Sequence, residues 1–461
     1  MTFCFVRSDV VARAYPLHYP LPRMHYYQFS ALLLQSGWLS PAYVGVDDQG
    51  LIQYLSADAP AEPGATPETV AGAALPGFQN AHSHAFQYGM AGMAEQHEPG
   101  TRDDFWSWRE AMYACAETFS PAQTEQVATT LYRHLLRNGY TSVVEFHYLH
   151  HDPVGRPYAN LAEMGERLVA AARTAGIKIT LVPVFYQKGD FGREPQPRQR
   201  RFISRSLDDY LKLLDASRGA VAPYERAALG FGVHSLRAVE AADVLATHAQ
   251  GPQDLPFHLH AAEQTLEVER SLAHLGARPV EWLLDNLPLN ERFHLVHCTH
   301  MTPAETSRLA RSGAQVVLCP GTEGNLGDGI FPLVEYAGAG GRWSIGTDSH
   351  ISLNPLEDLR WLDYGQRLIH RRRNTFADGA TTLVDTTYFA GQRAAGRRVA
   401  DYFAPGQPLD AVVYDLQQPL LAQAGPRHLL PALVYTADPT AVLGTLVDGR
   451  WAYRTGETAP D

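Results

Sequence analysis

The sequence predicts an α/β protein in which a (β/α)8 TIM-like barrel is joined to a small β-sandwich domain built from both chain ends. Between residues 73 and 400, eight Val-, Ile- and Phe-containing blocks alternate with helical blocks, a pattern typical of a parallel sheet with crossover helices. Gly139, Gly176 and Gly313 directly follow helical blocks, where C-terminal caps are expected. Strand-like text with hairpin turns flanks this region on both sides.

The chain begins with residues 1–24, which we expect to be a disordered extension because prolines, aromatic residues and charges follow one another there without periodicity. Residues 25–72 contain short apolar runs separated by Asp47-Asp48-Gln49-Gly50, which predicts a hairpin turn. Residues 401–461 contain a second hairpin signal, Asp448-Gly449, between two strand-like blocks. We therefore expect residues 25–72 and 401–461 to form the small β domain together.

The catalytic barrel is expected to span residues 73–400. Its strand blocks follow in order: Leu75–His84, Ser142–Tyr148, Lys178–Phe185, Ala228–Ser235, Pro256–Glu263, Phe293–His300, Gln315–Glu323 and Arg342–His350. The helical blocks between them include Thr124–Asn138, Leu161–Ala175, Arg237–His248, Leu266–Leu275 and Pro303–Ser312. In such barrels the active site lies at the C-terminal ends of the strands, so chemistry-bearing residues are to be sought there.

Composition excludes several classes of function. A net charge of -11 argues against non-specific binding to nucleic acid. No apolar run approaches the ~18 residues that a membrane-spanning helix needs, so we expect no membrane association. The four cysteines show no CxxC spacing, which favours a reduced protein located in the cytoplasm.

Histidines gather at the ends of the predicted strands. The first strand ends in His82-Ser83-His84, and side chains at positions i and i+2 of a strand point to the same face. The fifth block contains His258 and His260, the sixth contains His297, and the eighth contains Asp348. An isolated His-x-His pair is weak evidence for a metal site. The evidence is stronger here because residues that can bind a metal ion stand at several strand ends.

This arrangement resembles the amidohydrolase superfamily. The resemblance implies that the His-x-His pair, one fifth-strand histidine and the eighth-strand aspartate hold a metal ion; these residues are His82, His84, His260 and Asp348. Three imidazoles and one carboxylate suit one Zn²⁺ per chain, although Fe²⁺ and Mn²⁺ accept the same ligand types. The fourth strand block has no lysine that could bridge a second ion. His258 is the alternative fifth-strand ligand, but Glu263 follows His260 at the HxxE spacing of the superfamily's deaminases.

Longer blocks resemble one branch of this superfamily, the formimidoylglutamate deiminases. They are His82–Gln87, Ala91–Glu95, Phe105–Glu110, Glu145–Tyr148, His234–Arg237 and Cys319–Gly329. The resemblance implies hydrolysis of the C=N bond of N-formimino-L-glutamate, which gives N-formyl-L-glutamate and ammonia. It further implies three catalytic roles. Asp348 would accept the proton of the attacking water, His297 would orient the nucleophile or stabilise the tetrahedral intermediate, and Glu263 would relay a proton to the departing nitrogen.

The substrate implied by this resemblance is a small dicarboxylate amidine, whose carboxylates need cations. Arg109 and Arg237 are the candidates, because arginine pairs bidentately with carboxylates. Gln87, Tyr148 and His234 could add hydrogen bonds.

Two other functions compete with this one. A deaminase of the same superfamily that acts on a nucleobase or nucleoside derivative would keep the metal site but would need aromatic stacking around its substrate. A non-catalytic barrel would lack turnover altogether, although the complete set of ligands, together with His297 and Glu263, argues against it. A homodimer is expected from the resemblance alone.

Overall fold

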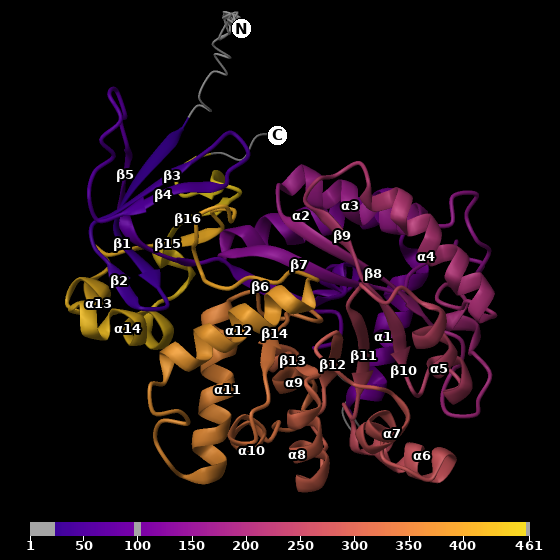
Figure 1. Cartoon of the computed structure of the whole chain (residues 1–461). Coiled ribbons are helices and arrows are strands. Elements are labelled where there is room, and N and C mark those ends of the chain that lie inside the picture. Colours follow the sequence, from indigo (N-terminus) through magenta and orange to yellow (C-terminus); the bar gives the residue numbers. More distant parts are fainter. Residues whose placement is uncertain (1–23, 96–102, 458–461) are drawn as a thin grey trace, which may run out of the picture.

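The computed structural model describes residues 24–95 and 103–457 (Figure 1). All but the last residue of the expected N-terminal extension lie outside the described residues. Eight parallel strands form the barrel sheet, in the order β14-β13-β12-β11-β10-β8-β7-β6, and a ninth, β9, pairs with β8. The barrel strands are β6 (Phe78–Ser83), β7 (Tyr140–His147), β8 (Lys178–Phe185), β10 (Phe231–Ser235), β11 (Phe257–Ala261), β12 (Phe293–His297), β13 (Gln315–Leu318) and β14 (Trp343–Ile345), and β9 spans Ala227–Leu229.

The first and last strands of the sheet meet at their C-terminal ends. Ser83 and Asp348 form a parallel β-bridge. The backbone N–H of Asp348 donates to the carbonyl of His82 at 3.0 Å, and the N–H of His84 donates to the carbonyl of Asp348 at 3.2 Å. This closure brings the two ends of the barrel sequence, residues more than 260 positions apart, into one site.

Helices surround the barrel, as Figure 1 shows. They are α1 (Phe105–Thr118), α2 (Pro121–Arg137), α3 (Glu163–Ala175), α4 (Leu207–Val221), α5 (Ala241–Gln250), α6 (Thr265–Leu275), α7 (Pro279–Asn286), α8 (Pro303–Ser312), α9 (Pro320–Leu326), α10 (Leu333–Gly338), α11 (Pro355–His370) and α12 (Ala380–Ala394). Local sequence fixes their ends. Ser120 and Gln123 form a capping box at the start of α2, and Gly139 follows its end with φ 93°. Gly176 and Gly313, at φ 84° and 86°, cap α3 and α8 as predicted.

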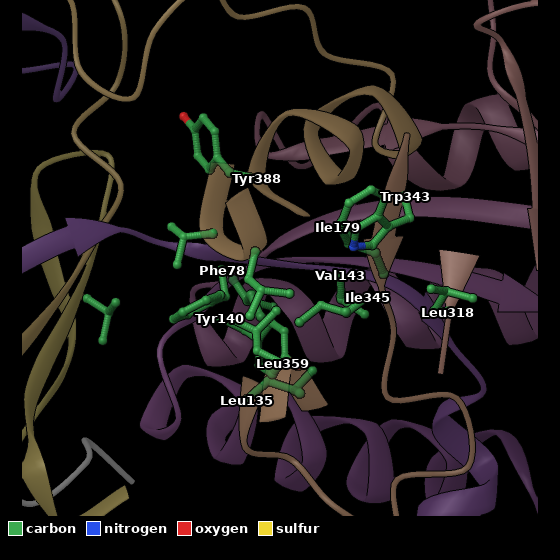
Figure 2. Close-up of a cluster of buried hydrophobic side chains, with 14 of the residues drawn as sticks. Phe78, Leu135, Tyr140, Val143, Ile179, Leu318, Trp343, Ile345, Leu359 and Tyr388 are labelled. Atoms are coloured by element: carbon green, nitrogen blue, oxygen red, sulfur yellow. The ribbon is translucent and has the colours of Figure 1, made fainter. Parts of the chain in front are cut away.

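Aromatic and aliphatic side chains pack between the barrel wall and its outer helices (Figure 2). Phe78 and Tyr140 extend from neighbouring strands and meet edge-on with ring centroids 6.2 Å apart. Leu135 of α2 and Leu359 of α11 are fully buried in the same cluster. Burying each such side chain stabilises the fold by about 1.5–3 kcal/mol, so the helices are held firmly against the strands that carry the site.

Both ends of the chain form a second sheet, ordered β17-β16-β15-β5-β1-β3-β4, with β2 paired to β1. In Figure 1 its indigo and yellow strands lie side by side. The strands are β1 (His25–Leu34), β2 (Gly37–Leu39), β3 (Ala42–Val46), β4 (Ile52–Ser56), β5 (Glu68–Pro76), β15 (Ala411–Asp415), β16 (Val442–Val447) and β17 (Arg450–Arg454), with the short helices α13 (Pro419–Ala422) and α14 (Leu429–Thr436). Both predicted hairpins, β3–β4 and β16–β17, are present, and the predicted fold class is confirmed.

The β domain is joined rigidly to the barrel. Only Gly77 separates β5 from β6, and a Cβ there would lie 2.2 Å from the Thr141 side chain, so the direct passage from one sheet to the other requires glycine. Lys178 at the start of β8 is buried and pairs with Asp410 at 2.5 Å and with Asp448 at 2.7 Å. Removing one partner of such a buried ion pair is expected to cost about 3–5 kcal/mol.

The seventh predicted strand is wrong in its second half. The block Gln315–Glu323 was expected to be extended throughout, but β13 ends at Leu318 and α9 begins at Pro320. Proline at the first helical position loses no intrahelical hydrogen bond. The carboxylate of Glu323 also turns back to accept the N–H of Cys319 at 2.9 Å. The helix that begins at Pro320 therefore brings the carboxylate of Glu323 close to His297.

Candidate metal centre and active site

Three histidines meet at the C-terminal end of the barrel. His82 and His84 extend from β6, and their Nε2 atoms are 3.0 Å apart. The Nε2 atom of His260, from β11, lies 3.1 Å from that of His82. All three side chains are buried, and their nitrogens form a group with the spacing that metal ligands have.

Backbone carbonyls orient two of these rings. His84 donates through Nδ1 to the carbonyl of Phe146 at 2.9 Å, and His260 donates through Nδ1 to the carbonyl of His234 at 3.0 Å. A neutral imidazole that donates through Nδ1 keeps only a lone pair at Nε2. Lone pairs that face one another at this distance in a buried site repel unless a cation lies between them. The donor set therefore fits a metal ion.

The structure distinguishes His260 from His258. Both rings point to the same side of β11, but His258 lies two residues deeper in the barrel and donates through Nε2 to the carbonyl of Ala394 at 3.0 Å. Its ring stacks on His294 with centroids 4.8 Å apart. Only His260 of this pair reaches the histidine cluster.

Asp348 lies between the cluster and His297. Its Oδ1 atom is 3.4 Å from Nε2 of His84 and 3.8 Å from Nε2 of His82. Its Oδ2 atom is 3.6 Å from Nε2 of His297, which also lies 3.5 Å from Oε1 of Glu263. One carboxylate oxygen thus faces the histidine nitrogens, and the other faces the imidazole that contacts Glu263.

Burial sets the protonation of the three clustered histidines. It lowers the pKa of His84 to about 3 and the pKa values of His82 and His260 well below the ordinary value, with neighbouring histidines adding to the effect for His82 and His260. Neutral imidazole is the form that binds metal ions. These rings are therefore in the binding form at neutral pH without needing a partner to remove their protons.

Carboxylates have the opposite effect on His297. Burial alone would lower its pKa, but the negative charges of Glu263, Asp348 and Glu323 outweigh burial and raise the pKa to about 10. Burial also raises the pKa of Asp348 to about 7, although a bound cation would favour the ionised carboxylate. The arrangement can exchange protons between an imidazolium and two carboxylates.

Two buried carboxylates that the sequence did not single out position these groups. Glu145 accepts from the Ser83 hydroxyl at 2.6 Å and from the Ala85 N–H at 2.6 Å, so it fixes the backbone on both sides of His84. Glu323 faces Nδ1 of His297 at 3.2 Å. Both residues stand inside blocks that carry the resemblance, which was the available signal for them.

All five predicted substrate-binding residues line one pocket with His84, His260, Glu263 and Asp348; these five are Gln87, Arg109, Tyr148, His234 and Arg237. Gln87 donates to the Tyr148 hydroxyl at 2.9 Å. Several aromatic side chains complete the wall, namely Phe105, Trp108, Tyr113, Tyr186 and Phe202. The pocket is therefore both aromatic and cationic, and it opens onto the histidine cluster.

Two arginines in this pocket carry unpaired N–H groups. Within residues 24–95 and 103–457, Nε and Nη1 of Arg237 and Nε of Arg109 are buried without a hydrogen-bond partner. Buried polar groups are normally satisfied, so these donors are available to an anionic ligand. Burial lowers the pKa of Arg237, but the charges of Glu267 and Glu263 outweigh it, and the side chain stays cationic.

Comparison with known proteins agrees with this geometry. Residues 73–452 match the Amidohydrolase family. The chain belongs to the amidohydrolase family. Among curated members, it is 44% identical over 435 residues to the formimidoylglutamate deiminase of Pseudomonas aeruginosa, covering 93% of this chain and 94% of that protein. The 8-oxoguanine deaminase of the same organism is 26% identical, with 88% of each chain covered.

Solved structures share the fold of this chain. An amidohydrolase from Brucella melitensis superimposes with a TM-score of 0.86 at 40% identity, covering 94% of this chain and 96% of that one. A zinc-bound adenosine deaminase from Xanthomonas campestris has a TM-score of 0.76 at 22% identity, with 92% of each chain covered, and shares the fold. In the part of the chain that the structure describes, no helix is both long and apolar enough to cross a membrane.

Proposed function

We propose that this amidohydrolase removes the imino group of N-formimino-L-glutamate by hydrolysis and releases N-formyl-L-glutamate and ammonia. The observation that carries this proposal is the 44% identity, over nearly the whole of both chains, to a formimidoylglutamate deiminase. The pocket supports it independently, because it combines a metal-binding histidine cluster with two arginines whose N–H groups lack partners.

We further propose that one Zn²⁺ per chain is held by His82, His84, His260 and Asp348. Fe²⁺ and Mn²⁺ are the alternatives, because they accept the same imidazole and carboxylate ligands. When bound, such an ion activates water as a nucleophile at neutral pH. Oδ1 of Asp348 faces the histidine nitrogens and is the oxygen available to the ion. Oδ2, on the side of His297, is then free to accept the proton of the attacking water.

The remaining steps belong to Glu263 and His297. Water adds to the formimino carbon as its proton passes to Asp348, and His297 Nε2 orients the nucleophile and stabilises the tetrahedral intermediate by a hydrogen bond to its new oxygen. Glu263 carries a proton to the departing nitrogen, so that the C–N bond breaks, ammonia leaves and the formyl C=O forms. The 3.5 Å separation of His297 Nε2 and Glu263 Oε1 supports proton exchange between these two groups.

Arg109 and Arg237 would bind the two carboxylates of the substrate, since a guanidinium pairs bidentately with a carboxylate. Gln87, Tyr148 and His234 would complete the recognition by hydrogen bonds from the same wall. The buried and unpaired oxygen of Gln87, Oε1, is suited to accept an amidine N–H of the substrate.

The competing function is deamination of a purine-type base, which the 26% identity to an 8-oxoguanine deaminase and the aromatic lining of the pocket favour. The deciding experiment measures the bound metal of the purified protein and ammonia release from N-formimino-L-glutamate beside a panel of purines and purine nucleosides. We expect one equivalent of metal and a preference for the amidine. Faster turnover of any purine overturns the proposed substrate, and absence of all turnover by the metal-loaded protein supports a non-catalytic barrel.

We propose that the enzyme acts in the cytoplasm as a homodimer. The described cysteines Cys115, Cys298 and Cys319 are buried free thiols, which supports a reducing compartment. Size-exclusion chromatography with light scattering measures the oligomeric state directly, and cell fractionation measures the location.

A further inference from the structure

Three guanidinium groups gather on one tryptophan at the substrate pocket. The Cζ atom of Arg109 lies 4.5 Å from the ring centroid of Trp106, that of Arg270 lies 4.9 Å away, and that of Arg237 lies 5.8 Å away. Arg270 is paired with Asp190. In the described chain, no carboxylate lies within ion-pair distance of Arg109 or Arg237, and both have buried N–H groups without partners.

Two effects oppose this arrangement. The positive charges of neighbouring guanidinium groups repel one another, and a long arginine side chain loses rotamer freedom when it is held in place. The face of an indole offsets both effects, because its π electrons attract cations and tryptophan does so best among the aromatic residues. Trp106 is half-buried on α1, and the ion pair of Arg270 with Asp190 fixes a cation over its ring. The ring thus supports two cations whose hydrogen-bond donors remain free. Each cation also lies over a second ring: Arg109 Cζ is 5.5 Å from the Tyr113 centroid, and Arg237 Cζ is 5.7 Å from the Phe105 centroid. Trp106 is the ring that the two share.

We propose that Trp106 is the positioning residue that makes this pocket select dicarboxylates. Its indole holds Arg109 and Arg237 side by side before any ligand binds, so that two carboxylates meet preformed partners and the cost of ordering two arginines does not reduce affinity. For the reacting end of the substrate this inference rests on the proposed function. The carboxylate end can be tested without any reaction.

The test uses glutarate as a non-reacting dicarboxylate probe and butyrate as the monocarboxylate of similar length, with Kd measured by calorimetry on the metal-loaded protein. We expect Trp106→Leu to weaken glutarate binding at least tenfold and to weaken butyrate binding much less. Trp106→Phe keeps an aromatic face and should recover part of the lost preference for glutarate over butyrate. It also provides a more conservative variant in case Trp106→Leu does not fold. Trp108→Leu is the matched control, because Trp108 lies on the same helix and itself lines the pocket but has no arginine over its ring within the described residues.

The selectivity ratio decides the outcome. If Trp106→Leu folds and keeps the wild-type ratio of glutarate to butyrate affinity, or if Trp108→Leu reduces that ratio equally, the inference is wrong. For N-formimino-L-glutamate, KM should rise more than kcat falls. A wild-type protein that binds glutarate in this Trp106-dependent way but does not turn over N-formimino-L-glutamate would overturn the proposed function and leave the inference intact.

An independent observation concerns the outer face of α11. Trp361, Tyr364 and Leu368 are 53%, 40% and 76% exposed, and their i, i+3 and i+7 spacing places them in one stripe along the helix. Glu357 lies seven residues before Tyr364 on α11, and Arg371 is the C-terminal cap of the helix, seven residues after Tyr364. The apolar stripe therefore has an acid near its start and a base just beyond its end. We call these five residues the α11 stripe.

From this pattern we infer that the α11 stripe docks against the same stripe of a second copy of this chain. Two such helices packed antiparallel around a twofold axis at Tyr364 would cover their apolar centres and place Arg371 of each copy opposite Glu357 of the other. A stripe with this charge order is complementary to itself only in the antiparallel orientation. The basic run that continues through Arg372 and Arg373 strengthens the attraction at both ends.

Sedimentation velocity at micromolar concentration tests this inference. We expect a wild-type dimer, a monomer for Leu368→Glu, and an unchanged dimer for Leu272→Glu, an equally apolar but separate exposed helix position that is 44% exposed. Arg371→Glu and Glu357→Arg should each weaken the dimer, and the double variant should recover it. A monomeric wild type, or a Leu368→Glu variant that remains dimeric, overturns the inference.

Discussion

Replacing Arg237 by methionine removes a buried guanidinium while keeping a side chain of similar length. In the structure Arg237 presents two unpaired N–H donors, Nε and Nη1, to the substrate pocket. Two charge-assisted hydrogen bonds to one substrate carboxylate would contribute about 1.5–3 kcal/mol each. Part of this is offset by the desolvation of the carboxylate, so we expect a loss of about 3 kcal/mol. At about 1.4 kcal/mol per factor of ten, KM for N-formimino-L-glutamate should rise by roughly two orders of magnitude.

The assay is steady-state ammonia release with the metal content of each preparation measured in parallel. Since Arg237 is proposed to bind a substrate carboxylate and not the reacting carbon, its interaction should be the same in the ground state and the transition state, and kcat should change little. Thermal stability should also change little. The lost attraction to Glu263 and Glu267 opposes the relief of two buried, unpaired donors. An unchanged KM in a folded, metal-loaded variant would remove Arg237 from the binding pocket.

Three further predictions test the metal centre and the buried histidines. Glu263→Gln should retain the metal and lose turnover by about 10²–10⁴-fold, as expected for a lost proton relay, whereas metal loss in parallel would make it a ligand. His260→Asn should lose most bound metal by elemental analysis while His258→Asn keeps it, because only His260 reaches the cluster. Burial lowers the pKa of His147 to about 3. Below pH ~6.5 the unfolded chain therefore binds a proton at this residue that the folded chain does not bind. As the pH is lowered from 6.5 to 3, the free energy of unfolding should fall by up to about 1.4 kcal/mol per pH unit. Urea titrations across this range should show a shallower decline for His147→Gln, and an identical slope would contradict the assignment.

Periodicity predicted which elements exist and which strand ends face the site. It could not decide between His258 and His260, because both side chains lie on the same face of a strand. The difference between them is depth. Two residues span about 6.6 Å along a strand, which takes His258 down to the Ala394 carbonyl and leaves His260 level with His82. Only the three-dimensional register of the barrel contains that information.

Other parts of the site depended on contacts between distant segments. Glu323 was expected in a strand, and its approach to His297 follows from the helix that begins at Pro320. Proline followed three residues later by glutamate is a recognisable helix start, so this signal was present in the sequence and outweighed by the apolar run before it. The position of Arg109 depends on how α1 packs over the barrel mouth. No local pattern encodes that packing, and only the resemblance pointed to it.

The backbone conformation distinguishes the three clustered histidines from two residues that are proposed to move protons. His82, His84 and His260 lie in or directly after strands without positive φ, so strand periodicity was sufficient to find them. His297 and Asp348 instead adopt φ 70° and 48°.

A left-handed backbone costs a non-glycine residue about 1–2 kcal/mol, and glycine would avoid that cost at either position. The left-handed turns bring the imidazole of His297 and Oδ2 of Asp348 to 3.6 Å, and Ala262, at φ 51°, makes the corresponding turn directly before Glu263. Strain of this kind persists only where the surrounding structure enforces it. Here it coincides with the three groups that would pass a proton from water to the departing nitrogen, which is the part of the site that side-chain pattern alone could not place.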